Sequence, residues 1–317
     1  MRSWSRVAGM VVVAFAAASC VVPNPGSEQV LRAFSTGAES RIDVAYGPDD
    51  GCAGPVSDEE CGGSQTFDLY PATKGSGPRP VIVYLHGGGW DGGDKRTGVY
   101  PNILDQTRRG SVVIDANYRL APAVRFPAPL QDVKRLVRWI KVHAAELGVD
   151  ARRITVSGHS AGGNLASMVG VTDGQFEPPL DPSDPADAPL LGVSSGVAAV
   201  VDIAGPVDYA QFIARVPSLA DKAFSDYLDT TTDGELLKAA SPIPYVGPGD
   251  APQYLVSGET DMITPPTDHQ ALAMTYVHAG LSDRMWIDIV DGEGHVPNGI
   301  NQAALNAFLD IPEHISV

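Results

Sequence analysis

The residues best suited to chemistry are a serine, a histidine and an aspartate, each in a separate loop. Ser160 lies in "GHSAG", directly after the apolar run "RITVS" and directly before a helical stretch. A G-x-S-x-G turn between a strand and a helix lifts the serine hydroxyl above the sheet, at a helix N-terminus that favours negative charge. Because a serine hydroxyl is a poor nucleophile without a base, the sequence should also hold a partner histidine.

The base and the acid that orients it are expected after the last two strand-like segments. Among seven histidines, His295 follows "MWIDIV" in the loop "DGEGH", whereas His159 is too close to Ser160 in the turn to accept its proton. Asp261 in "SGETD" comes between them, in the chain order Ser, Asp, His. Three other carboxylates remain alternatives for the acid: Glu259, Asp288 and Asp291.

A glycine-rich loop is expected to complete the site. "HGGGW" follows the apolar run "PVIVYL", and bare glycines there let backbone N–H groups approach a developing oxyanion closely. The predicted donors are Gly88, Gly89 and Ala161, the residue after the serine. A phosphate-binding loop is excluded, because the chain has neither G-x-x-x-x-G-K-[ST] nor G-x-G-x-x-G at this place.

The elements that must position these loops begin at Pro80, where apolar runs of strand length start to alternate with helical stretches. The expected strands are 80–85, 111–118, 153–158, 197–205, 253–258 and 285–292. Strands buried on both faces and alternating with helices form a mostly parallel sheet. Before them, "RIDVAYG" and "TFDLYPA" are expected to pair antiparallel at a sheet edge. Residues 207–245 carry short helical pieces that could form a small lid or a pocket wall.

Together, "HGGGW", "NYRLAPAVRFPAPLQD", "GHSAGGN", "GETD" and "GEGH" resemble motifs of the α/β-hydrolase superfamily. More narrowly, they are similar to those of hormone-sensitive-lipase-like and bacterial feruloyl-esterase-like carboxylesterases over residues 66–310. The resemblance implies an α/β-hydrolase fold with helices on both faces of a mostly parallel sheet. It also implies a triad of Ser160, His295 and Asp261, with the same three oxyanion donors. His159 stands where the lipase branch commonly has Asp, which favours the feruloyl-esterase-like side. Residues 21–79 are predicted to contain a tether, a Cys loop and strands in place of the helical N-terminal cap of the lipase branch, so a small or absent cap is expected.

Composition limits the partners. The chain has 317 residues and a formal net charge of −16, which argues against nucleic acid because a phosphate backbone requires a basic surface. Neither a metal nor an organic cofactor is needed for the expected chemistry. The expected partner is a small-molecule or polymer-borne ester.

The N-terminus indicates export. Residues 1–19 have the positive, apolar and small-residue order of a signal peptide. "AASC" resembles a bacterial lipobox, which predicts lipidation of Cys20 and a membrane tether over 20–40, although simple cleavage after "AAA" remains open. The catalytic domain is expected to span 41–317. In an exported chain, Cys52 and Cys61 are predicted to form a disulfide.

The sequence therefore predicts an exported serine carboxylesterase that hydrolyses short-chain or small esters through an acyl-enzyme. An amidase or peptidase, or a polysaccharide deacetylase or feruloyl esterase, could use the same machinery. A non-catalytic binding protein on this fold is a further alternative, because fold alone does not prove function.

Overall fold

The computed structural model describes residues 41–48, 64–217, 226–230 and 232–311. The predicted signal peptide, tether and Cys52–Cys61 disulfide lie outside these residues, so they remain predictions, as does the domain division. Among the described residues, no helix combines the length and the apolar character that crossing a membrane requires.

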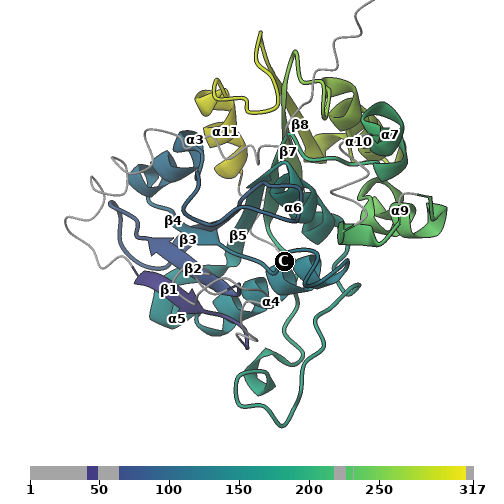
Figure 1. Cartoon of the computed structure of the whole chain (residues 1–317). Coiled ribbons are helices and arrows are strands. Elements are labelled where there is room, and N and C mark those ends of the chain that lie inside the picture. Colours follow the sequence, from purple (N-terminus) through teal and green to yellow (C-terminus); the bar gives the residue numbers. More distant parts are fainter. Residues whose placement is uncertain (1–40, 49–63, 218–225, 231, 312–317) are drawn as a thin grey trace, which may run out of the picture.

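One eight-stranded sheet forms the centre of the molecule, in the order β1-β2-β4-β3-β5-β6-β7-β8 (Figure 1). Its strands are β1 Arg41–Ala45, β2 Thr66–Tyr70, β3 Arg79–Leu85, β4 Val112–Ala116, β5 Val149–His159, β6 Ala199–Ile203, β7 Gln253–Gly258 and β8 Met285–Val290. β2 runs antiparallel to both of its neighbours, and all pairs from β4 to β8 are parallel. The expected edge pair and the mostly parallel sheet are both confirmed.

Helices cover both faces of this sheet, as predicted (Figure 1). They are α3 Pro101–Leu104, α4 Ala128–Val142, α5 Ala144–Leu147, α6 Ala161–Val171, α7 Tyr209–Arg215, α9 Gly234–Ala240, α10 Pro266–His278 and α11 Gln302–Leu309. Alternation along β3 shows the two faces: Val81 and Val83 pack with α4 and α6, while Ile82 and Tyr84 pack with α3 and α11. Buried apolar side chains on both faces hold the sheet in place.

The parallel strands end at one edge of the sheet, and the loops with the candidate residues leave from that edge. β3 pairs with β5 up to Leu85 opposite Gly158, and β7 pairs with β8 up to Gly258 opposite Val290. The register therefore aligns the starts of four loops that lie far apart in sequence. In an open α/β sheet this edge is where ligands bind.

The segment between β6 and β7 carries two seven-residue helices, α7 and α9, among its described residues. They contact each other and lie on the right-hand side of the molecule in Figure 1, with α7 next to α10. Tyr209 and Phe212 of α7 and Leu237 of α9 are buried in the core cluster under α6. The described part of this segment is thus packed as a wall of the domain.

Candidate active site

Ser160 occupies a strained turn between β5 and α6. Its backbone is left-handed, with φ of 54° and ψ of −116°, and its N–H donates to the carbonyl of Ile203 over 2.8 Å. A Cβ on Gly158 would overlap the backbone of Gly162, and a Cβ on Gly162 would overlap the carbonyls of Leu85 and His86. Only glycine on both sides lets the turn close and lets α6 begin so near β3.

Three side chains from three loops form a continuous hydrogen-bonded line. Ser160 Oγ lies 2.9 Å from Nε2 of His295, and Nδ1 of His295 lies 2.9 Å from Oδ2 of Asp261. These contacts span 135 and 34 residues of sequence. The structure brings together the serine, histidine and aspartate expected from the sequence, at distances suited to proton transfer.

The Asp261 carboxylate is held from several directions. Oδ1 accepts the backbone N–H groups of Ile263 and Thr264, at 2.8 and 3.0 Å. The Thr264 hydroxyl lies 2.8 Å from Oδ2 and 3.2 Å from Nδ1 of His295. Burial raises the pKa of Asp261. The hydrogen bond and the charge of His295, together with the hydrogen bonds from Thr264, outweigh the effect of burial and leave the pKa below its usual value. The acid is therefore ionised and fixed in orientation.

Two of the three alternative carboxylates, Glu259 and Asp288, serve other contacts in the structure. Glu259 accepts the N–H of Gly292 at 2.8 Å, and Asp288 accepts the hydroxyl of Tyr254 and the N–H of Asn301. Neither forms the hydrogen bond to His295 that Asp261 forms. Geometry thus favours Asp261 as the orienting acid.

The glycine-rich loop turns back beside the serine. Gly88 and Gly89 both have positive φ, 122° and 63°, and a Cβ on Gly88 would overlap the backbone of Gly92. A Cβ on Gly87 would lie 3.3 Å from that of Ser160. Within the described part of the chain, the N–H groups of Gly88, Gly89 and Ala161 have no hydrogen-bond acceptor. Three such donors near a nucleophile are what an oxyanion requires.

A buried lysine anchors the far end of this loop, a role that the sequence motifs did not reveal. The side chain of Lys95 is fully buried, and its Nζ donates to Asp43 at 2.6 Å and lies 3.5 Å from Asp68. Its backbone N–H donates to Oδ1 of Asn117 at 2.6 Å. Asp43, with φ of 54°, sits where the register of β1 shifts. In the sequence, Lys95 is visible only as a lysine that follows a glycine-rich loop. Its burial could not be predicted, because its partners lie far from it in the chain.

His159, also without an assigned role from the sequence, braces the base. Its Nε2 lies 2.7 Å from the backbone carbonyl of His295 and can donate to it. Burial, together with the charge of the neighbouring His295, lowers the pKa of His159 to about 4. The ring is therefore neutral near pH 7 and holds the His295 loop without adding charge beside the base.

Aromatic packing surrounds the loop on its inner side. Trp90 stacks on Tyr227 with ring centroids 4.8 Å apart and lies 5.5 Å from Tyr209, and all three are at most 2% exposed. Trp90 is thus a packing residue. On the outer side, Met262 and Val296 are 81% and 52% exposed. They directly follow the candidate acid and base, so the rim of the site is apolar.

Two curated relatives of Mycobacterium tuberculosis are similar to this chain. A probable carboxylic ester hydrolase, LipM, is 28% identical over 76% of this chain and 52% of its own length. Esterase LipQ is 30% identical over 67% of this chain and 48% of its own length. The chain spans about half the length of the curated relatives it matches.

Solved structures share the fold. A truncated carbohydrate esterase from gut microbiota superposes with a TM-score of 0.70 at 23% identity, covering 88% of this chain and 97% of that one. Esterase Est2 of Thermogutta terrifontis, with propionate bound, gives 0.61 at 24% identity over 87% and 92%. The BD-FAE family model matches residues 67–276, which run from the second residue of β2 past the end of β7 and include the candidate nucleophile. The chain therefore belongs to the BD-FAE family of α/β-hydrolases.

Proposed function

We propose that this protein is an exported serine carboxylesterase that hydrolyses esters with small acyl groups. The observation that carries the proposal is the line from Ser160 Oγ through both ring nitrogens of His295 to Asp261, with 2.9 Å at each contact. The site faces solvent through His295, whose side chain is 19% exposed, so a substrate can reach it.

In the first half of the proposed reaction, Ser160 Oγ attacks the ester carbonyl carbon while Nε2 of His295 takes the hydroxyl proton. The carbonyl oxygen becomes an oxyanion, stabilised by the N–H groups of Gly88, Gly89 and Ala161. Asp261 stabilises the imidazolium and stays ionised. His295 then gives the proton to the leaving alkoxide, and the alcohol departs from an acyl-enzyme on Ser160.

In the second half, water takes the place of the alcohol. His295 accepts a proton from the water as its oxygen attacks the acyl carbon, and the same N–H groups stabilise the second oxyanion. Collapse of this intermediate returns the proton to Ser160 Oγ and releases the carboxylic acid. Every proton moves through His295, and no further cofactor takes part.

The preference for small acyl groups is supported by packing. Trp90, Tyr209 and Tyr227 fill the inner side of the oxyanion loop, so little room is left there for a long chain. The names of other relatives point the same way: versiconal hemiacetal acetate esterase and arylacetamide deacetylase, 32% and 38% identical over 45% and 36% of this chain. Because arylacetamide is an amide, the name arylacetamide deacetylase is a reason to test amides as well as esters.

Hydrolysis of p-nitrophenyl esters of increasing chain length, with p-nitroacetanilide as the amide, tests the proposal. We expect kcat/KM to be highest for acetate to butyrate and to fall for longer chains. The kcat of Ser160→Ala should be at least about 10⁴-fold lower than that of the wild type. Ser194 is an exposed serine, and Ser194→Ala should keep the wild-type kcat. Equal rates in wild type and Ser160→Ala would reject the nucleophile, and a preference for the anilide would make the protein an amidase.

Export and lipidation form a separate part of the proposal, which rests on the sequence of residues 1–20. Expression of the full chain in a bacterial host should place the wild type in the membrane fraction. Cys20→Ala should move it to the soluble exported fraction. Wild type found in the soluble exported fraction, like Cys20→Ala, would leave a secreted, unlipidated protein as the alternative, and both chains in the membrane fraction would contradict a tether at Cys20.

A further inference from the structure

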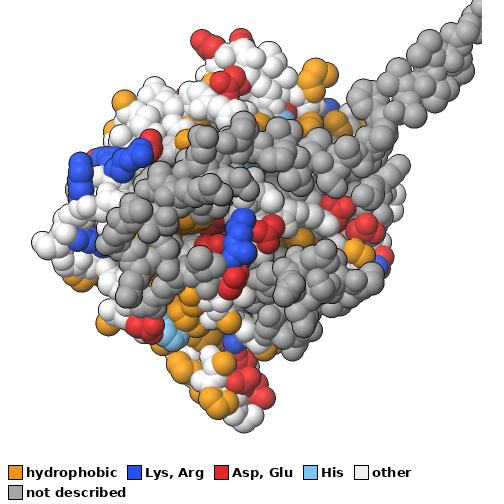
Figure 2. Space-filling view, turned by 60° about the vertical axis from the view of Figure 1, so that its left-hand side comes forward, with side chains coloured by type: hydrophobic (Ala, Val, Ile, Leu, Met, Phe, Trp, Pro, Cys, Tyr) orange, Lys and Arg blue, Asp and Glu red, His pale blue; other side chains and the backbone are white. Residues whose placement is uncertain are grey.

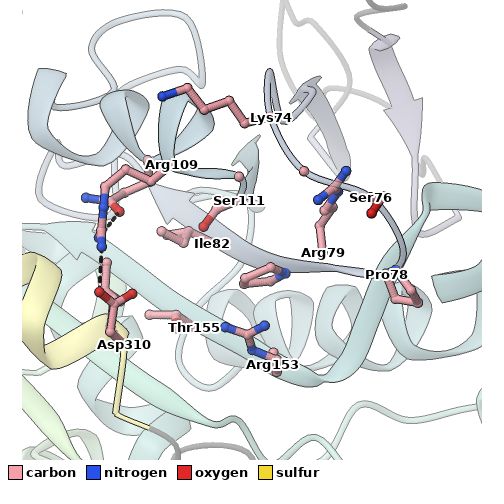
Figure 3. A pocket seen from close by; sticks show the side chains of 15 residues that line it. Lys74, Ser76, Pro78, Arg79, Ile82, Arg109, Ser111, Arg153, Thr155 and Asp310 are labelled. Carbon is pink, nitrogen blue, oxygen red and sulfur yellow. Dashed lines mark hydrogen bonds and ion pairs between the residues drawn. The ribbon is translucent and has the colours of Figure 1, made fainter.

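A polar hollow lies where β3 and β5 begin, at the edge of the sheet opposite the candidate active site. Its volume is about 300 Å³, close to the lower limit of small-molecule pockets. Its lining includes the side chains of Lys74, Arg79, Arg109, Ser111, Arg153 and Asp310 (Figure 3). The part of β5 from Arg153 to its last residue is roughly 20 Å long. The hollow and the site at Ser160 therefore lie at opposite ends of this part of the strand and are distinct.

The charge of this hollow is opposite to that of the whole chain. Its lining contains four cationic side chains and one carboxylate, whereas the chain has 22 Lys and Arg against 38 Asp and Glu. On the face drawn in Figure 2, several basic side chains lie together at the upper left, while another lies near the centre among acidic ones. A local excess of positive charge in an acidic protein creates a potential that draws anions.

Only one of the four cations has an ionic partner among the described residues. Arg109 pairs with Asp310 at 2.5 Å and donates to Gln106 at 3.1 Å. For Lys74, Arg79 and Arg153, no ion pair within 4 Å and no side-chain hydrogen bond to another described residue is found, although Arg79 and Arg153 are half-buried. The pKa of Asp150 is lowered mainly by its hydrogen bond to Arg152 and in part by the charge of Arg153, but the ion pair of Asp150 is with Arg152. Half-buried guanidinium groups without a partner are costly, and a bound anion would offset that cost.

The backbone shapes the hollow around these groups. Gly75 has φ of 87°, and a Cβ there would overlap Nη1 of Arg79, so the guanidinium rests directly against the glycine. Figure 3 shows the Arg79 and Arg153 side chains on different sides of the hollow, and Ser111 adds a buried hydroxyl to its lining. A planar donor on either side and a hydroxyl suit an oxyanion with several oxygens.

We propose that this hollow is a binding site for a small multivalent oxyanion of the phosphate type, such as a phosphate ester or a diphosphate. Three unpaired cations call for more than one negative charge, which a single carboxylate cannot supply. The same chemistry could come from a free phosphate compound or from the headgroup of an anionic phospholipid.

Calorimetric titration of the full chain with pyrophosphate at low salt tests the site. We expect saturable binding with one molecule per chain, weakened at least tenfold in Arg79→Gln and in Arg153→Gln. Arg152→Gln is the matched control, because Arg152 precedes Arg153 on β5, is exposed, pairs with Asp150 and is outside the lining. It should bind as the wild type does, and all variants should keep wild-type hydrolysis of p-nitrophenyl acetate.

Vesicles distinguish the two sources of phosphate. If the ligand is a lipid headgroup, phosphatidylglycerol vesicles should retain the Cys20→Ala chain, pyrophosphate should compete, and phosphatidylcholine vesicles should not retain it. If the ligand is a free phosphate compound, pyrophosphate should bind and neither kind of vesicle should. Absence of saturable pyrophosphate binding by the wild type, or an equal loss in Arg152→Gln, would overturn the proposal.

Discussion

Thr264 lies where the acid and the base of the candidate site meet. Its N–H and hydroxyl both contact the Asp261 carboxylate, and the hydroxyl also lies 2.9 Å from the carbonyl of Ala204 on the neighbouring loop. Because a hydroxyl has one proton, it can donate to only one of these oxygens at a time. Thr264 thus positions Asp261 and touches no reacting atom.

Replacing Thr264 with Val should therefore lower kcat while leaving KM nearly unchanged. We expect kcat for p-nitrophenyl acetate to fall about tenfold, which is about 1.4 kcal/mol and typical of one lost hydrogen bond to a charged group. Thr264→Ser should restore most of the rate. The control is Thr275→Val, which removes a similar hydroxyl from α10, away from the site. A wild-type kcat in Thr264→Val would rule out the positioning role.

His159 should make folding stability depend on pH. Its pKa is lowered from 6.5 to about 4 in the folded protein, mainly by burial. Between these values the unfolded chain binds a proton at this residue and the folded chain does not, so stability decreases as pH falls from about 6.5 toward 4. In His159→Asn, Tm should fall less over this range than in the wild type. Equal decreases in Tm would contradict the assignment.

At the scale of elements, the first turn of α6 packs directly against the end of β3. Gly162 lies in the first turn of α6, where any side chain would meet the carbonyls of Leu85 and His86. This contact fixes the distance between the loop that carries Gly88 and the turn that carries Ser160. The packing of α6 against β3 therefore determines the positions of the N–H groups that would bind the oxyanion.

Gly162→Ala should be destabilising as well as inactivating. We expect a loss of about 3 kcal/mol in the free energy of unfolding, because the clash is with backbone rather than with a side chain that could move. Gly234→Ala is the control, since Gly234 begins α9 with no atom within 4 Å of an added Cβ. There alanine should be neutral or stabilising in chemical denaturation. Similar unfolding free energies for the two variants would contradict the packing account.

The order and type of the elements could be predicted because their signals are local. The run 253–258 was predicted as a strand with the bounds that β7 has, and 80–85 differs from β3 by one residue. β5 begins at Val149, four residues before the predicted start, because Val149 pairs with Arg79 ahead of a register shift. Hydrophobic pattern alone gives no signal for such an irregular extension.

At the scale of the whole molecule, the sheet separates two regions of different chemistry. The carboxyl edge of the parallel strands carries Ser160 and its partners, and the amino edge carries the basic hollow. The first could be predicted, because motifs such as "GHSAG" mark the end of a strand. The second could not, because Lys74, Arg109 and Arg153 are scattered in sequence and only the fold brings them to one hollow.

The central claim is that Ser160 is a nucleophile activated by His295. Its most direct test is covalent labelling with a fluorophosphonate, followed by mass spectrometry of the intact chain and of its proteolytic fragments. We expect one adduct per wild-type chain, located on Ser160, no adduct in Ser160→Ala and much slower labelling in His295→Gln. Labelling of Ser160→Ala at the wild-type rate, or an adduct on another residue of the wild type, would contradict the claim.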